Sequence, residues 1–255
     1  MGRRPISSDE KTLDGECRAS MAGVRTCFSG ERWKTQLAPL PDGRGSERLT
    51  DRACQQAAFG TRLSMKTVGI LALQGDFEAH RKAIERAGAR AVEVRTVAQM
   101  HACDGLIIPG GESTAMLKLL EIENLLEPLR EFGRNKPVYG TCAGAILIAH
   151  EVSHPSQTCL DLMDISVERN GYGRQIDSHI AALKMEAGAQ SAEGTDLEAV
   201  FIRAPIIRRV GGGARVLARH QGDPVWVEQG RHMVTTFHPE LTQDVRVHRR
   251  FVERL

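Results

Sequence analysis

The sequence predicts an α/β fold in which an open, mostly parallel β-sheet is flanked by helices. Two observations carry this prediction. Between residues 65 and 132, short apolar runs that are typical of buried strands alternate with segments of helical spacing. Beyond residue 160, strand-like runs follow one another more closely and are separated by turn sequences, which indicates an antiparallel portion in the C-terminal half.

The first 64 residues differ from the rest in composition. They contain only nine Ile, Leu, Val or Phe residues, fewer than a segment needs to bury an apolar core. We therefore expect residues 1–64 to be a disordered N-terminal extension, or sequence that precedes the true start at Met65. A tail that binds a partner is the alternative. One domain is expected from residue 65 to residue 255.

The first strand of that domain is predicted at residues 68–73, an apolar run that Gly75 bounds, and helical spacing follows it. Two further runs, at 91–94 and 105–108, predict the next strands. Residues 114–132 then have the pattern of one long amphipathic helix. Strands and helices that alternate in this way are typical of a parallel sheet covered on both faces.

A fourth unit begins with a strand at residues 137–139 and continues as a small, apolar helix at 145–149. Glycine-rich turns, at 109–113 and 140–144, come directly after the third and the fourth of the predicted strands. In open α/β sheets, ligands bind at the carboxyl ends of the strands. We therefore expect both turns to border the functional site.

The C-terminal half has a denser pattern of strands. Strand-like runs lie at residues 164–168, 200–202, 215–218, 225–228 and 233–237. Residues 221–224 and 229–231 have the composition of hairpin turns, so the strands that they join are predicted to be antiparallel. The chain ends in a predicted helix at 243–255.

Charge and cysteine content exclude several classes of protein. With 34 Lys and Arg against 32 Asp and Glu, the net charge of +2 gives no reason to expect nucleic acid or a membrane surface as a partner. No stretch has the length of a transmembrane helix or the apolar core of a signal peptide, so we expect a cytoplasmic protein. The six cysteines form no paired spacing, and neither a metal nor a cofactor is expected.

One cysteine has the context of a nucleophile. Residues 140–144 read Gly-Thr-Cys-Ala-Gly, a tight turn between a strand and a helix that would expose the side chain of Cys142 at its tip. At the N-terminus of a helix, the positive end of the dipole favours thiolate over thiol. Cys142 is therefore the candidate nucleophile, whereas the other five cysteines are expected to be ordinary thiols.

A thiolate in acyl transfer needs a base and a third group that orients this base. His238 follows a predicted strand, and the carboxylate of Glu240 can reach back to its ring. The Pro-Gly-Gly-Glu-Ser turn at 109–113 could supply backbone N–H groups to an oxyanion. A phosphate-binding loop is the alternative for this turn, but neither G-K-[ST] nor G-x-G-x-x-G spacing is present.

Together these motifs resemble those of class I (triad) glutamine amidotransferases. Three further strings make the chain similar to the glutaminase subunits of pyridoxal 5′-phosphate synthase: ERNGYGRQ at 168–175, FIRAP at 201–205 and FHPELT at 237–242. Ala143 after the nucleophile, and Ile146 where other members have Gln, are also typical of this branch. The resemblance extends from residue 66 to residue 255.

This resemblance implies a flavodoxin-like fold and an enzyme that hydrolyses L-glutamine to L-glutamate and ammonia. The ammonia would pass to a separate synthase subunit in a hetero-oligomer that builds pyridoxal 5′-phosphate, and no cofactor is implied for the glutaminase. The implied catalytic residues are the nucleophile Cys142, the base His238 and the orienting Glu240. The implied glutamine-binding residues are Gly111, Glu112, Ser113, Arg169, Ile202 and Arg203. The implied oxyanion donors are the N–H groups of Gly111 and Ala143.

Two other functions stay open. One is a different cysteine amidase or hydrolase on the same fold, such as a member of the deglycase or intracellular-peptidase family. That family typically has His directly after the nucleophile, and this chain has Ala143 there. The other is a catalytically silent module that only binds the synthase, although such a module has no need to keep Cys142, His238 and Glu240 together.

Overall fold

The computed structural model describes residues 65–169, 178–187, 194 and 196–255, together with three short strands nearer the N-terminus. The chain divides into two compact units, Met1–Leu63 and Ser64–Leu255. Among the described residues, no helix combines the length and the apolar character that crossing a membrane requires.

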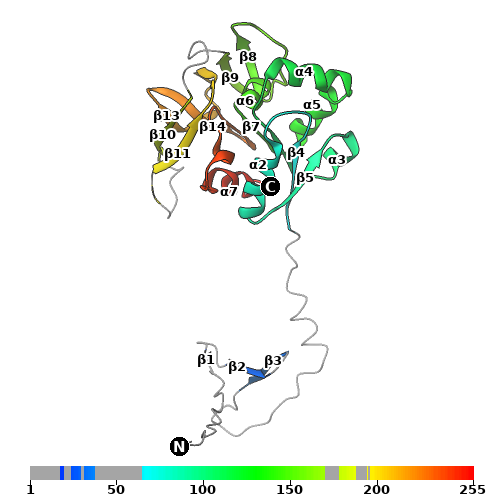
Figure 1. The fold of residues 1–255 in the computed structure, drawn as a ribbon, viewed down its shortest axis with the longest axis vertical. Helices are drawn as coiled ribbons and strands as arrows, with labels where there is room; N and C mark the ends of the chain where they lie inside the picture. The colour runs from blue at the N-terminus through cyan, green and yellow to red at the C-terminus, as the bar shows by residue number, and fades with distance from the viewer. Residues whose placement is uncertain are drawn as a thin grey trace, which may run out of the picture. The chain divides into compact units, whose positions relative to one another are not determined.

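The N-terminal unit contains a small antiparallel sheet (Figure 1). Its strands are β1 (Arg18–Ala19), β2 (Val24–Ser29) and β3 (Arg32–Leu37). No strand is predicted here from the sequence, so β2 and β3 are a difference from the expected disordered extension. In both strands, β-branched, aromatic or Leu residues alternate with other residues, and the register pairs Phe28 with Trp33. The absence of a packed core in residues 1–64 stays a prediction.

The second unit is built on a seven-stranded sheet in the order β13-β14-β15-β7-β6-β4-β5. The strands that pair in parallel are β4 (Thr67–Leu71), β5 (Arg90–Val94), β6 (Gly105–Ile108), β7 (Val138–Thr141) and β15 (His232–Thr235). Two antiparallel hairpins extend the sheet beyond β15, through β14 (Asp223–Gln229) and β13 (Ala214–His220). The predicted mostly parallel sheet with an antiparallel C-terminal portion, including both hairpin turns, is confirmed.

Helices cover both faces of this sheet (Figure 1). They are α2 (Phe77–Arg86), α3 (Val97–His101), α4 (Ser113–Ile122), α5 (Leu126–Asn135), α6 (Ala143–Ile148) and α7 (Arg246–Val252). Apolar residues of α3 to α6 belong to one buried cluster, and those of α2 and α7 belong to a second. In β6, Leu106 and Ile108 join the first cluster while Ile107 joins the second, because successive side chains point to opposite faces.

The prediction of a single long helix at residues 114–132 is wrong. The segment forms two helices, since α4 ends at Ile122 and α5 begins at Leu126. Between them Asn124 has φ 54°, a left-handed conformation that ends helices and that asparagine tolerates well. The apolar spacing continues across this turn, which is why the pattern alone indicates a single helix.

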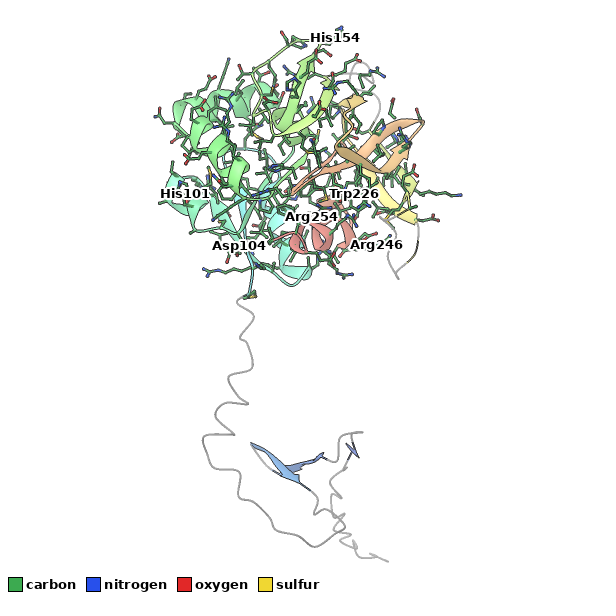
Figure 2. All side chains as sticks on the ribbon, turned by 180° about the vertical axis from the view of Figure 1, so that it is seen from behind. His101, Asp104, His154, Trp226, Arg246 and Arg254 are labelled. Carbon is green, nitrogen blue, oxygen red and sulfur yellow. The ribbon has the colours of Figure 1, made fainter. Side chains whose placement is uncertain are left out.

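Two small sheets complete the unit. One has the order β12-β9-β8, and the other pairs β10 with β11. Their strands are β8 (Ala149–Ser153), β9 (Met163–Glu168), β10 (His179–Lys184), β11 (Asp196–Phe201) and β12 (Ile206–Val210). The strands β8, β10 and β12 are not predicted from the sequence, and in β10 only Leu183 is buried, so the apolar signal there is weak. Trp226 of β14, labelled in Figure 2, is buried in the second cluster.

Candidate active site

Cys142 occupies a strained turn between β7 and α6. Its φ of 48° lies in the left-handed region, which non-glycine residues rarely adopt. The flanking glycines are required by close packing: a Cβ on Gly140 would lie 2.5 Å from the carbonyl carbon of Gly144, and one on Gly144 would lie 2.1 Å from the carbonyl oxygen of Ile108. The sequence therefore folds here into the sharp elbow that the Gly-x-Cys-x-Gly pattern predicts.

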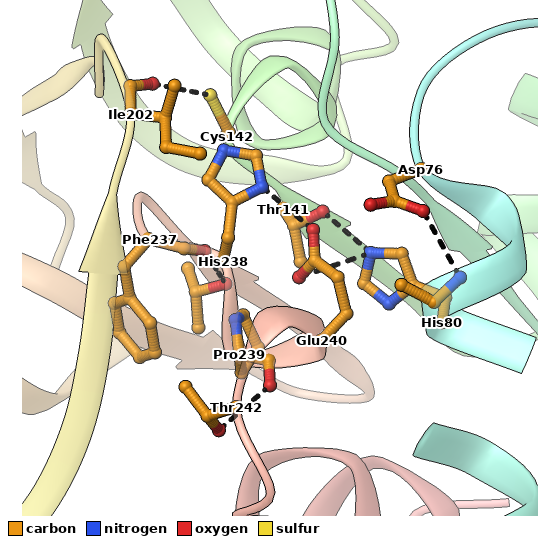
Figure 3. A network of polar contacts seen from close by, with 12 residues as sticks. Asp76, His80, Thr141, Cys142, Ile202, Phe237, His238, Pro239, Glu240 and Thr242 are labelled. Carbon is orange, nitrogen blue, oxygen red and sulfur yellow. Dashed lines mark hydrogen bonds and ion pairs between the residues drawn. The ribbon is translucent and has the colours of Figure 1, made fainter. Parts of the chain in front are cut away.

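His238 and Glu240 lie together just after β15, at the start of the short 3₁₀-helix η1 (Pro239–Leu241). Nδ1 of His238 is 2.7 Å from Oε1 of Glu240, so the carboxylate holds the ring from behind (Figure 3). The backbone N–H of His238 donates to the carbonyl of Val200, which fixes this loop against β11. The side chain of Glu240 is fully buried.

The imidazole of His238 lies between Glu240 and Cys142 (Figure 3). In the described part of the chain, Nε2 of His238 has no hydrogen-bond partner, and the sulfur of Cys142 lies 3.9 Å from the carbonyl oxygen of Ile202. The backbone at Gly110 approaches both side chains, because a Cβ there would lie 2.4 Å from Cε1 of His238 and 3.4 Å from Cβ of Cys142. Nε2 is thus available for a proton transfer beside the sulfur.

The electrostatics of the site favour a charged imidazole. Burial opposes the charge on His238, but Cys142 and Glu240 more than offset it and raise the pKa of the ring to about 10. Burial also opposes the charge on Glu240, yet His80 and His238 lower the pKa of this carboxyl to about 2. At neutral pH the arrangement therefore holds an ionised carboxylate, a protonated ring and a neighbouring sulfur.

A cavity of ≈ 180 Å³ adjoins these side chains. Its lining residues are Gly111, Glu112, Ser113, Cys142, Ile146, Arg169, Ile202, Arg203, Pro205 and His238. All six residues that the resemblance implies for glutamine binding are among them. Glu240 lies behind His238, and Ala143 begins α6, where the first N–H groups lack intrahelical acceptors.

Glu112 and Arg169 contact each other at the rim of this cavity. The carboxylate of Glu112 accepts hydrogen bonds from the backbone N–H groups of Thr114 and Ala115, at 3.0 and 2.6 Å, and so caps α4. Nη2 of Arg169 lies 3.3 Å from Oε1 of Glu112 and donates to the hydroxyl of Thr114 at 2.9 Å. Burial would raise the pKa of Glu112, but the two N–H groups and Arg169 lower it overall. The rim therefore carries paired opposite charges.

Gln74 is a site residue that the sequence does not reveal. Its Nε2 donates to the carbonyl oxygen of Glu112 at 2.7 Å, and Gly111 has φ 143° in the same turn. A Cβ on Gly111 would lie 2.7 Å from Nε2 of Gln74. The one available signal is that Gln74 is a polar residue just beyond the end of β4, where functional side chains gather.

The described residues contain no group of three or more His, Cys, Asp or Glu side chains that could hold a metal ion. The geometry instead places a cysteine, a histidine and a carboxylate in sequence, beside a cavity with both signs of charge at its rim. Such an arrangement can form and break a covalent bond to sulfur while one ring moves the proton.

Comparisons with known proteins identify relatives of this chain. A curated relative from Solibacter usitatus (strain Ellin6076), named pyridoxal 5′-phosphate synthase subunit PdxT, is 59% identical over 193 residues, which are 75% of this chain and 100% of the relative. A relative of the same name from Koribacter versatilis (strain Ellin345) is 51% identical over 73% of this chain and 94% of its own length.

A solved structure described as a glutamine amidotransferase matches with a TM-score of 0.67 and 43% identity, over 73% of this chain and 97% of that one. The structure of PurLQS from Thermotoga maritima shares the fold alone, with a TM-score of 0.52 and 15% identity, over 74% and 98% of the two chains. The model of the SNO glutamine amidotransferase family matches residues 70–255. The chain therefore belongs to the SNO glutamine amidotransferase family.

Proposed function

We propose that this chain is the glutaminase subunit of a pyridoxal 5′-phosphate synthase. It hydrolyses L-glutamine to L-glutamate and ammonia, and it supplies the ammonia to a synthase subunit. A relative named as a subunit of this enzyme, 59% identical over its whole length, supports the assignment. The observation that carries it is the cavity in which Cys142 and His238 face a rim with both signs of charge. A cytoplasmic location stays a prediction.

The first half of the reaction releases ammonia. The thiolate of Cys142 attacks the side-chain amide carbon of glutamine, so that a C–S bond forms and the carbonyl oxygen becomes an oxyanion. The N–H groups of Gly111 and Ala143 stabilise this oxyanion. The protonated His238 gives its proton to the amide nitrogen, the C–N bond breaks, and a γ-glutamyl thioester remains on the sulfur.

The second half of the reaction restores the enzyme. The ring of His238, now neutral, takes a proton from a water molecule as the oxygen attacks the thioester carbon. The C–S bond breaks, glutamate forms, and the sulfur leaves as the thiolate beside the recharged imidazolium. Glu240 stays ionised throughout, because its charge stabilises the imidazolium and holds the ring in one orientation.

The rim charges match the α-carbon end of glutamine, which carries a carboxylate and an ammonium group. Arg169 and Arg203 supply positive charge, and Glu112 supplies negative charge. The buried Ser113, whose hydroxyl donates to Gln157 Oε1 at 3.0 Å, and Ile202 close the remaining sides. The cavity thus selects a small zwitterion with an amide at its far end.

The test is ammonia release from glutamine by the purified chain, with and without its synthase subunit. We expect weak release by the chain alone and a rise of at least about tenfold with the partner, because one missing oxyanion donor costs roughly a hundred- to a thousandfold in turnover. Docking would bring the Gly111 N–H to the oxyanion, so Gly111→Val should blunt the rise. Full activity that the partner leaves unchanged would favour a stand-alone amidase, and none in either state would favour a silent binding module.

A further inference from the structure

A second pair of histidines, His80 and His248, lies buried behind Glu240. Neither side chain is exposed, and they come from α2 and α7, far apart in the sequence. Nδ1 of His80 is 3.0 Å from Nε2 of His248. Nε2 of His80 is 3.1 Å from the hydroxyl of Thr141, the residue directly before the nucleophile (Figure 3). The ring of His80 therefore joins two helices to the nucleophile turn.

The same ring faces the second oxygen of Glu240. Oε1 of this carboxylate is held by His238, whereas Oε2 has no hydrogen-bond partner in the part of the chain that the structure describes. Nε2 of His80 lies 3.5 Å from Oε2, and both side chains are fully buried. A buried carboxylate oxygen without a hydrogen bond is costly, and Nε2 of His80, which also contacts the hydroxyl of Thr141 at 3.1 Å, is the ring nitrogen that lies beside it.

The neighbours of His80 fix its tautomer. An ionised carboxylate accepts hydrogen bonds only, so Nε2, which faces Glu240, carries the proton. Nδ1 of His80 is then an acceptor, and Nε2–H of His248 donates a hydrogen bond to it. Burial lowers the pKa of both rings, that of His248 to about 3, and so favours the neutral form of each ring. His248 of α7 thus donates to His80 of α2, and Nε2–H of His80 faces Glu240.

We propose that His80 is a positioning residue of the proposed glutaminase reaction: its Nε2–H fixes the second oxygen of Glu240, and His248 fixes the tautomer of His80. This inference rests on the proposed function for its substrate, but not for its geometry. Without the donor, the carboxylate of Glu240 would be less firmly oriented, and its ionised form would be less strongly stabilised. The imidazolium of His238, and through it the thiolate of Cys142, would then be less favoured at low pH.

Three substitutions of His80 separate a donor from a space-filling side chain. His80→Gln places an amide N–H near the position of Nε2, His80→Asn places one near the position of Nδ1, and His80→Leu supplies none. With the synthase subunit present, we expect kcat for glutamine to fall at least about tenfold in His80→Leu and His80→Asn, with KM within about twofold of wild type. His80→Gln should recover most of the loss.

The pH profile tests the same point. The titratable groups that face His80 are Asp76, Tyr139, His238, Glu240 and His248. The acid limb of kcat should move to higher pH in His80→Leu and His80→Asn and stay in place in His80→Gln. If His80 only fills space, the acid limb of kcat should lie at the same pH in every folded variant. That result would overturn the proposal.

A second measurement does not depend on glutamine. The rate at which iodoacetamide alkylates Cys142, followed by mass spectrometry of the Cys142 peptide, should shift to higher pH in His80→Leu and His80→Asn but not in His80→Gln. If wild type releases no ammonia but this shift is present, the proposed function fails and the positioning role stands. If wild type releases ammonia and all variants share one alkylation profile, the positioning role fails. If His80→Leu does not fold, the contrast between His80→Gln and His80→Asn decides.

Discussion

The two sides of His238 stabilise charge in different ways. On the cavity side, the side chain of Arg169 is 12% exposed, but its partner Glu112 is 55% exposed, so water shares the solvation of the Glu112 charge. On the far side, the side chain of Glu240 is 0% exposed, and the rings of His238 and His80 face its charge. Loss of Arg169 would therefore leave the charge of Glu112 solvated by water. The charge of Glu240, by contrast, depends on each of the side chains that donate to it.

The largest effect is expected at the nucleophile. Cys142→Ala should abolish ammonia release, because no other group in the cavity can form the thioester. The thermal midpoint of unfolding should change little, because the substitution keeps Cβ and removes only the sulfur from this buried side chain. His238→Asn should be almost as severe. Glutamine hydrolysis at the wild-type rate in Cys142→Ala would contradict the assignment.

Glu240→Gln tests the buried side. An amide keeps the shape of the carboxylate but removes the charge that favours the imidazolium and can impose the wrong tautomer on the ring. We expect kcat to fall by roughly a hundredfold or more, with KM little changed, but less than in Cys142→Ala. Steady-state kinetics with the synthase subunit measure both constants. A rise in KM alone would place Glu240 in substrate binding instead.

Arg169→Met tests the cavity side. Because the guanidinium lies at the rim and faces the proposed α-carboxylate, we expect KM for glutamine to rise about tenfold with a smaller change in kcat. Arg95→Met is the matched control, since the half-exposed Arg95 pairs with Glu93 and lines no part of the cavity. Equal KM values in the two variants would remove Arg169 from the binding site.

The buried histidines predict a smaller, pH-dependent effect on stability. The folded-state pKa of His248, about 3, lies below its ordinary value of 6.5. As pH falls below 6.5, His248 becomes protonated in the unfolded chain but stays neutral in the folded chain. The free energy of unfolding therefore decreases as the pH falls through this window. The thermal midpoint should therefore decrease between about pH 7 and about pH 5, and less steeply in His248→Leu. Parallel slopes in the two proteins would contradict this interpretation.

The smallest effect is expected from removing residues 1–64. The apolar pattern of the second unit begins with β4, and the removed segment has too few apolar residues to form a core. Glutaminase activity and thermal midpoint should match those of the full chain. Loss of soluble protein on starting at Met65 would show that the segment packs against the domain.

Local patterns predict the turns at the cavity and the contact between His238 and Glu240. Glycines at 110, 111, 140 and 144 mark sharp turns, and strands that precede both turns bring them to one edge of the sheet. His238 and Glu240 are two residues apart, so their contact needs no knowledge of the fold. Each of these features depends on a short stretch of sequence, and the fold class can be predicted from the spacing of such stretches.

The buried side is set by contacts between distant segments, and no local pattern reveals it. The position of His80 in α2 is typical of the buried face of a helix, so the sequence gives no sign of a special role. The packing of α2 against α7 brings its ring to His248. For the same reason Gln74 is missed, because its partner is a backbone carbonyl 38 residues away. The break at Asn124 is missed because the apolar spacing continues through it.

In the proposed mechanism, Cys142 forms a covalent intermediate with glutamine. The most direct test is the intact mass of the chain, mixed with glutamine and the synthase subunit, then quenched in acid during turnover. We expect a γ-glutamyl thioester that maps to the Cys142 peptide and is absent from Cys142→Ala. Ammonia release at the wild-type rate with no adduct on Cys142, or with an adduct on another residue, would contradict it.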